Sequence, residues 1–262
     1  TSISLTNAHL TPKAIREALS RYSTYSYSTG RDLSGLSIQD LGAIDDPDSN
    51  EAATTTAIKT ADKELTIALG GDNSITYAVG LGVFGEDLAT AGLITLDAHH
   101  DLRDGISNGS PVRRLIDAGL DPKRIVQIGI NDFSNSASYA QLASDLGITV
   151  ISREIVAEIG IKEACNIALT VAGSAEGPIH VDLDVDVCDR SVVPACPAAA
   201  PGGLSAFELR QATRILTSNE LVRGIDITEI DASKDSEDGR TVRLAALLVL
   251  ETVAGYLSRN SR

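Results

Sequence analysis

Short apolar runs alternate with amphipathic helical stretches through most of the chain, and this alternation constrains the fold more than any other feature. Apolar runs of strand length occupy residues 65–69, 92–96, 125–130, 149–151, 179–184 and 221–226. Helical patterns follow them, and a Ser205–Glu208 capping box opens the helix expected over residues 205–217. The pattern predicts an α/β fold, in which helices cover both faces of a central, mainly parallel sheet.

The remaining segments give weaker patterns. Two more strands are expected at residues 3–6 and 37–41, and one long helix over residues 154–171. The Ser-, Thr- and Tyr-rich residues 20–35 are expected to form a loop. No linker or internal repeat divides the sequence, so we expect a single domain over residues 1–262.

Composition excludes several classes of partner. The formal net charge of −14 argues against nucleic acid or an anionic membrane as a partner. No apolar run approaches the roughly 18 residues of a membrane span, and the N-terminus shows no secretory signal. The three cysteines show no CxxC spacing, and an odd number in a chain of this size indicates reduced thiols and a cytoplasmic location.

A charged motif follows the apolar run at residues 92–96. Asp97, His99 and Asp101 alternate along the chain, so their side chains point the same way in an extended backbone. They are therefore aimed at one point beyond the carboxyl end of the strand. Two carboxylates and an imidazole that converge in this way are typical ligands of a divalent metal ion.

A second acidic cluster ends the run at residues 179–184. Asp182 and Asp184 share one face of this strand, and Asp186 continues the alternation past its expected end. So many acids on two strand ends would repel one another without cations, and they exceed what one metal ion needs. We expect a two-metal hydrolytic site, and the excess of oxygen ligands favours Mn²⁺ over Zn²⁺.

Five motifs lie at the ends of expected strands or close to them. They are Asp97-Ala98-His99-x-Asp101, Asp182-x-Asp184, Gly70-Gly71-Asp72-x-Ser74, Pro201-Gly202-Gly203-Leu204-Ser205 and Asp226-x-x-Glu229. Taken in their order along the chain, these motifs resemble those of the arginase/agmatinase (ureohydrolase) family. The resemblance implies a three-layer arginase-like fold, two Mn²⁺ per chain, a small-molecule guanidino substrate, and a homo-oligomer as a common assembly.

The resemblance also implies a role for each residue at a family position. The metal ligands would be Asn73, Asp97, His99, Asp101, Asp182 and Asp184. Asp97 and Asp182 would bridge the two ions, and a water between the ions would attack the guanidino carbon. Asp101 would take the proton of that water and pass it to the leaving amine. Glu229 would face the guanidine group as its counter-charge.

Four positions bear on the substrate. Asn73 stands where the family has a metal-binding His, and Asn108 stands where it has a His that shuttles protons. The loop over residues 101–108 is short compared with that of arginases, so its substrate contacts do not transfer. Asp132 and Ser134 lie where arginases hold the α-amino group with acids; Asp132 fits, whereas Ser134 replaces an acid.

These departures suggest an altered substrate. An N-hydroxyguanidine is less basic than a guanidine and depends less on acid catalysis, so the two asparagines favour Nω-hydroxy-L-arginine, cleaved to L-ornithine and hydroxyurea. They resemble an arginase-like branch, the hydroxyarginine hydrolases of D-cycloserine biosynthesis. The alternatives are arginase, agmatinase or formimidoylglutamase activity. A different alternative is a non-catalytic ureohydrolase-like subunit.

Overall fold

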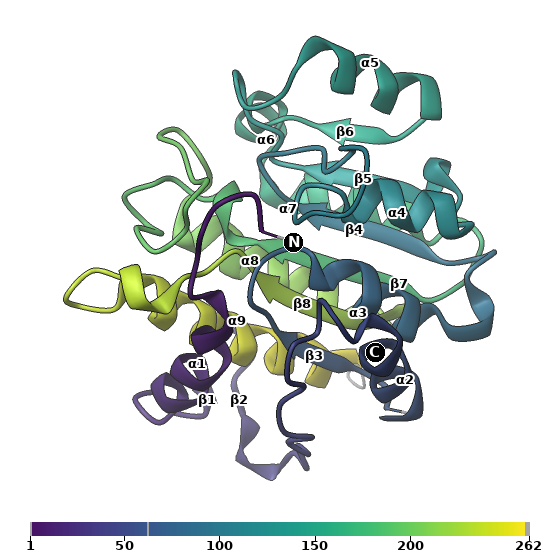
Figure 1. The fold of residues 1–262 in the computed structure, drawn as a ribbon. Helices are drawn as coiled ribbons and strands as arrows, with labels where there is room; N and C mark the ends of the chain where they lie inside the picture. Colours follow the sequence, from purple (N-terminus) through teal and green to yellow (C-terminus); the bar gives the residue numbers. More distant parts are fainter. Residues whose placement is uncertain (1, 62, 260–262) are drawn as a thin grey trace.

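A parallel sheet forms the centre of the protein (Figure 1). The computed structural model describes residues 2–61 and 63–259. Within these ranges the main sheet has six strands in the order β3-β8-β7-β4-β5-β6, and every neighbouring pair is parallel. The strands are β3 (Thr66–Leu69), β4 (Gly92–Leu96), β5 (Ile125–Ile128), β6 (Thr149–Ile151), β7 (Ile179–Asp184) and β8 (Val222–Thr228).

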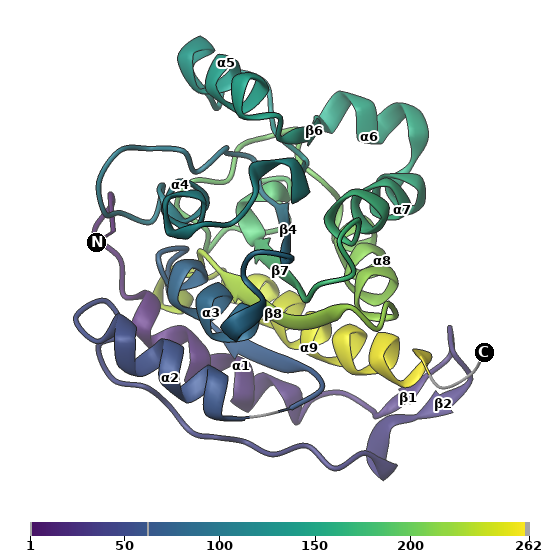
Figure 2. The same ribbon diagram turned by 90° about the vertical axis from the view of Figure 1, so that its right-hand side faces the viewer.

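Helices form a layer on each face of this sheet (Figure 2). One face is covered by α2 (Glu51–Ala61), α3 (Ile75–Phe84) and α4 (Pro111–Ala118). The other is covered by α1 (Thr11–Leu19), α7 (Ile161–Ala172), α8 (Ala206–Thr217) and α9 (Arg240–Leu257). Beside the edge strand β6 lie α5 (Ala137–Leu146) and α6 (Arg153–Ile159). The three-layer α/β/α prediction is confirmed.

Short 3-10 helices complete the described elements. They are η1 (Ala8–Leu10), η2 (Leu33–Gly35), η3 (Gly85–Asp87), η4 (Pro122–Arg124), η5 (Val185–Val187) and η6 (Ala232–Lys234). The predicted capping box is present at the start of α8, where Ser205 and Glu208 satisfy each other's backbone N–H groups.

Strand alternation decides which residues reach the functional edge. In β4, Ile94 and Leu96 belong to the apolar core that includes α7 and α8 residues, whereas Leu93 packs into a separate core with Phe84 of α3. Because alternate residues face opposite sides, Asp97 points to the α3 side of the sheet, like Leu93. The polar end of β4 therefore lies between the sheet and the start of α3.

Four sequence predictions about elements were wrong. Residues 3–6 and 37–41 are not strands; Ile3 instead donates its backbone N–H to the Asn108 side chain, 3.0 Å away. The expected helix over residues 154–171 is two helices, because Gly160 has a φ of 81°, which a right-handed helix cannot contain. The loop at residues 20–35 contains a small antiparallel hairpin of β1 (Tyr25–Ser26) and β2 (Arg31–Asp32).

The three cysteines lie inside the protein. Cys165, Cys188 and Cys196 are buried and form no disulfide, and burial raises the pKa of the Cys165 thiol to about 12. Among residues 2–61 and 63–259, no helix has the length and apolar character needed to cross a membrane.

Candidate metal centre

The candidate site lies at the carboxyl edge of four adjacent strands. Asn73 follows β3, Glu229 follows β8, Asp184 ends β7 and Asp97 follows β4. These strands are consecutive in the sheet order, so their ends meet. The carboxyl edge is where open α/β sheets bind ligands.

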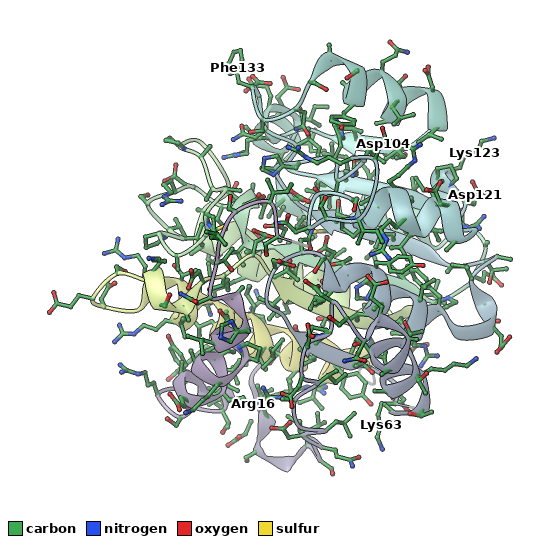
Figure 3. All side chains as sticks on the ribbon, viewed as in Figure 1. Arg16, Lys63, Asp104, Asp121, Lys123 and Phe133 are labelled. Atoms are coloured by element: carbon green, nitrogen blue, oxygen red, sulfur yellow. The ribbon has the colours of Figure 1, made fainter. Side chains whose placement is uncertain are left out.

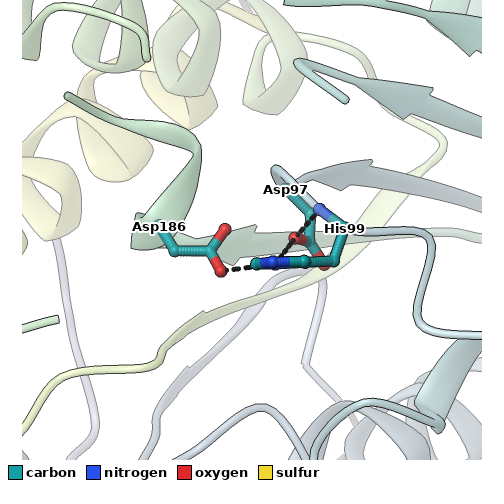
Figure 4. A group of neighbouring side chains, drawn as sticks. All are labelled: Asp97, His99 and Asp186. Atoms are coloured by element: carbon teal, nitrogen blue, oxygen red, sulfur yellow. Dashed lines mark hydrogen bonds and ion pairs between the residues drawn. The ribbon is translucent and has the colours of Figure 1, made fainter. Parts of the chain in front are cut away.

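Asp97, His99 and Asp186 form the tightest polar cluster at this edge (Figure 4). One ligand atom of each lies within 4.8 Å of the others. His99 Nδ1 is 2.7 Å from Asp186 Oδ2 and 3.5 Å from Asp97 Oδ1. Asp186 Oδ1 accepts the Ala98 backbone N–H at 3.0 Å, so Asp186 is fixed against the motif that follows β4.

The charges in this cluster perturb one another. Burial and then the Asp186 charge raise the pKa of Asp97 to about 7, despite hydrogen bonds from His99 that lower it. Burial would lower the pKa of His99, but hydrogen bonds and charges from Asp186 and Asp97 raise it to about 11. Without a metal ion, a protonated His99 therefore supplies the positive charge that these acids need.

A second group surrounds Asp101 and Glu229. Asn73 Nδ2 donates to Asp101 Oδ2 at 2.6 Å, and the Asn73 backbone N–H donates to Glu229 Oε1 at 2.9 Å. Asn108 Nδ2 donates to the same Glu229 oxygen at 2.7 Å. The structure thus brings together four residues that the sequence singled out, from the ends of β3, β4 and β8 and the loop before α4.

Asp101 and Glu229 share two unusual properties. Both have left-handed backbone conformations, with φ of 51° and 60°, which non-glycine residues adopt rarely and mostly at functional sites. Both are also nearly buried. Burial raises the pKa of Glu229 to about 7, against the donors Asn108 and Asn73, and burial with the Asp97 charge raises the pKa of Asp101 well above its usual value.

The side-chain amide of Asn73 is held from both sides. Its Oδ1 accepts hydrogen bonds from Thr76 Oγ1 and Thr228 Oγ1, each at 2.8 Å, while its Nδ2 faces Asp101. Hydroxyl groups can accept as well as donate. A rotated amide would keep both threonine contacts and turn its oxygen toward Asp101. The sequence analysis did not identify these two threonines.

Asp182 and Asp184 occupy different depths of β7. Asp182 is paired in register with Thr95 of β4 and Asp226 of β8, in the middle of the sheet. Burial and then the Asp226 charge raise its pKa well above the usual value. Asp184 ends the strand, and its Oδ1 accepts the Asp186 backbone N–H at 2.8 Å. The geometry thus favours Asp186 over Asp182 as a neighbour of His99.

The loop after β5 places Asp132 and Ser134 at the rim. Asp132 is exposed, as is Phe133, whose side chain projects into solvent (Figure 3). Asn135 has a contact that the sequence analysis missed: its Oδ1 accepts the His100 backbone N–H and its Nδ2 donates to Ala98 O. Asn135 thereby fixes the backbone between Asp97 and Asp101.

The donor set fits a divalent cation. Asp97 Oδ2 is buried, and no hydrogen-bond partner for it is present in the described part of the chain. Buried carboxylate oxygens without partners are costly unless a cation approaches them. The carboxylates outnumber the imidazoles, which suits Mn²⁺ or Mg²⁺. The arrangement can therefore hold a metal ion between the ends of β4 and β7.

The chain is similar to known proteins over nearly its whole length. The sequence model of the Arginase family matches residues 2–255. A formimidoylglutamase from Halalkalibacterium halodurans is 36% identical over 267 residues, which cover 97% of this chain and 83% of the relative. The crystal structure of Bacillus subtilis formimidoylglutamase is similar, with a TM-score of 0.89 and 32% identity over 97% of this chain and 83% of that one.

A more distant structure shares the fold alone. Trypanosoma cruzi formiminoglutamase with Mn²⁺ has a TM-score of 0.89 and 23% identity, over 98% of this chain and 88% of that one.

Proposed function

The chain belongs to the arginase family, and from this premise we propose that it is a binuclear manganese hydrolase that cleaves N-formimidoyl-L-glutamate to L-glutamate and formamide. The supporting observation is its similarity to formimidoylglutamases along 97% of its length. The comparisons favour this substrate over Nω-hydroxy-L-arginine, because the relatives described above are named for formimidoylglutamate and none is named for hydroxyarginine. The reaction stays within the amidinohydrolases, which break a C–N bond with water.

We propose a set of metal ligands in which Asp184 and Asp186 take the places that the sequence prediction gave to Asp182 and Asp184. Asp97, His99, Asp184 and Asp186 would hold one side of the metal pair. Asp101 and Asn73 would hold the other ion, with Asn73 rotated so that its oxygen faces it. Two Mn²⁺ ions, when bound, would lower the pKa of a water molecule enough to make it a nucleophile.

The residues of the chain would do the rest of the work. Glu229 would pair with the cationic amidine, and Asn108 and the Asn73 backbone N–H would keep its carboxylate in position. Asp101, with its raised pKa, is suited to receive a proton and deliver it to the departing nitrogen. In this substrate the departing nitrogen is the α-nitrogen of glutamate.

The rim also suits a substrate that lacks a free ammonium group. In N-formimidoyl-L-glutamate the α-nitrogen is part of the amidine, so no ammonium remains to be bound. Ser134 occupies a position where arginases hold the α-amino group with an acid, and Asp132 is exposed to solvent. A single exposed acid would give an ammonium group little stabilisation, because water screens it.

The test is a comparison of substrates with Mn²⁺ present. N-Formimidoyl-L-glutamate, Nω-hydroxy-L-arginine, L-arginine and agmatine are assayed for release of glutamate, ornithine or putrescine. The expected result is the largest kcat/KM for the formimidoyl compound. Faster turnover of hydroxyarginine would support the competing substrate, and no turnover of any compound would support a non-catalytic subunit.

A further inference from the structure

A cationic side chain of the loop before α4 lies beside the residues that surround Glu229. This loop runs from Asp101 to Ser110 and carries Arg103. The Arg103 backbone N–H donates to Gly109 O at 3.0 Å and closes the loop on itself. The backbone of Arg103 is therefore held in place, although its side chain is exposed.

The stem of Arg103 lies across Gly109. A Cβ atom added to Gly109 would be 2.8 Å from Arg103 Cδ and 3.0 Å from Nε, so a larger residue there would push the stem away. Gly109 directly follows Asn108, whose amide donates to Glu229 Oε1 at 2.7 Å. The Arg103 side chain thus starts one residue away from the contact that holds the amidine-binding acid.

The guanidinium of Arg103 is open to an external ligand. Among residues 2–61 and 63–259 it has no hydrogen bond or ion pair, although Asp104 is its neighbour in sequence. The Asp104 carboxylate lies 3.5 Å from Arg113, which also lies 3.6 Å from Asp117.

Other arginines at this edge of the sheet are occupied. The Arg153 and Arg190 guanidinium groups donate to the Gly202 and Cys196 carbonyls. Arg103 is thus available to an external anion, whereas these neighbouring guanidinium groups already have partners.

We propose that the Arg103 guanidinium binds a carboxylate of the substrate and selects amidines that carry carboxylates; this inference rests on the proposed function. In N-formimidoyl-L-glutamate the two carboxyl carbons lie three and five bonds from the amidine carbon. An amidine paired with Glu229 would therefore keep both carboxylates close to the loop. A guanidinium matches a carboxylate with two parallel hydrogen bonds, which makes it a selective receptor.

The proposal also answers a problem of charge. The candidate site is rich in carboxyl groups and the chain carries a net charge of −14, which disfavours an approaching dicarboxylate. A cation beside Asn108 would offset this repulsion where the substrate enters. If Arg103 binds a substrate carboxylate, replacing it should raise KM for a dicarboxylate more than KM for an amidine without carboxylates. If Arg103 has no such role, replacing it should not distinguish the two substrates.

The experiment uses Arg103→Gln and Arg103→Lys in the Mn²⁺-loaded full chain. Arg223→Gln is the matched control, because it removes an exposed guanidinium at the amino end of β8, on the opposite edge of the sheet from Arg103. KM and kcat are measured for N-formimidoyl-L-glutamate and for an N-alkylformamidine without carboxylates. Binding of L-glutamate is measured separately by calorimetry, and the Mn²⁺ content of each variant is determined.

Arg103→Gln is expected to raise KM for the dicarboxylate roughly 10- to 100-fold, the range of one charge-assisted pair. It should weaken L-glutamate binding by a similar factor. Its kcat, its Mn²⁺ content and its turnover of the uncharged amidine should stay unchanged. Arg103→Lys should restore part of the affinity, and Arg223→Gln should match the unsubstituted protein.

The outcomes separate the two proposals. If the unsubstituted protein hydrolyses formimidoylglutamate and Arg103→Gln leaves both KM and L-glutamate binding unchanged, the role of Arg103 is overturned while the proposed function stands. If the unsubstituted protein does not hydrolyse it, the proposed function fails. L-Glutamate binding that depends on Arg103 would then still support the carboxylate receptor, and binding that does not would overturn it.

Discussion

Whether Asp182 or Asp186 is a metal ligand can be decided by comparing two substitutions of the same kind. Asp186→Asn and Asp182→Asn each replace a buried carboxyl with an amide of nearly the same shape. Asp186 is 2.7 Å from His99, and its pKa is lowered because the His99 hydrogen bond and charge outweigh burial. Asp182 has no such cation beside it, and burial raises its pKa well above normal. The first substitution therefore removes the carboxylate that contacts His99, and the second changes a buried carboxyl group that has no cation beside it.

The expected magnitudes differ accordingly. Even residues that only support a metal ligand change affinity 10- to 100-fold, so losing Asp186 as a ligand should weaken Mn²⁺ binding at least ~100-fold, or about 2.7 kcal/mol. Asp182→Asn should change Mn²⁺ affinity less than about threefold, or ~0.7 kcal/mol. Asp186→Asn should also lower the pKa of His99, since the first contact that raises it would lose its charge.

Calorimetric titration of metal-free protein with Mn²⁺ gives both affinities, and NMR titration gives the His99 pKa. Thermal unfolding of each variant checks that the fold is intact. If Asp182→Asn abolished Mn²⁺ binding while Asp186→Asn retained it, the ligand assignment argued from the structure would be wrong and the spacing first expected from the sequence would be correct.

Three other predictions concern the candidate site and the packing of α8 against α9. In metal-free protein the folded pKa values of Asp97 and Glu229, about 7, lie above the unfolded values near 4, so the folded state holds extra protons. The free energy of unfolding should therefore fall as pH rises from about 4 to 7, and Mn²⁺ should raise Tm more at pH ~8 than at ~5; a constant Mn²⁺ effect would contradict this. Asn73→His should tighten the weaker Mn²⁺ site and leave the tighter one unchanged, as measured by calorimetry; unchanged affinity would mean that Asn73 is not a ligand. Glu251→Gln should lower the free energy of unfolding by about 1–3 kcal/mol in urea denaturation, because the buried Glu251 carboxylate accepts hydrogen bonds from Arg210 and Arg214; an unchanged midpoint would argue against this pairing.

The fold was predictable because its pattern is carried by many residues. The apolar runs that became β3 to β8 are each short, but together they define strand–helix alternation, and the sheet order satisfies it. Single residues were harder to weigh. Gly160 alone divides one expected helix into α6 and α7, since its positive φ outweighs an otherwise continuous helical pattern. Residues 3–6 were mistaken for a strand because local apolarity does not reveal a contact with Asn108.

The candidate site was predictable in type and less so in detail. Alternation placed Asp97 near His99, as the structure does, but it selected Asp182 and Asp184 and left Asp186 out. β7 ends at Asp184 as predicted, but the sequence did not show that Asp186, in the 3-10 helix η5 that follows, contacts His99. Asn135 and Thr228 were not recognisable, because each acts through a partner distant in sequence. Their amide and hydroxyl groups have no spacing that marks them in advance.

The charge balance of the site links the metal ions to the choice of substrate. Five carboxyl groups, those of Asp97, Asp101, Asp184, Asp186 and Glu229, gather at one edge of the sheet. Two divalent ions would offset four of these charges, which leaves Glu229 free to pair with a cationic amidine. This balance would let an acidic site accept an amidinium, but it provides nothing for the two carboxylates of the proposed substrate. A separate cation is then needed at the rim, where it cannot compete with the metals for the same acids. Arg103 meets this requirement, since its neighbour Asp104 is already paired with Arg113.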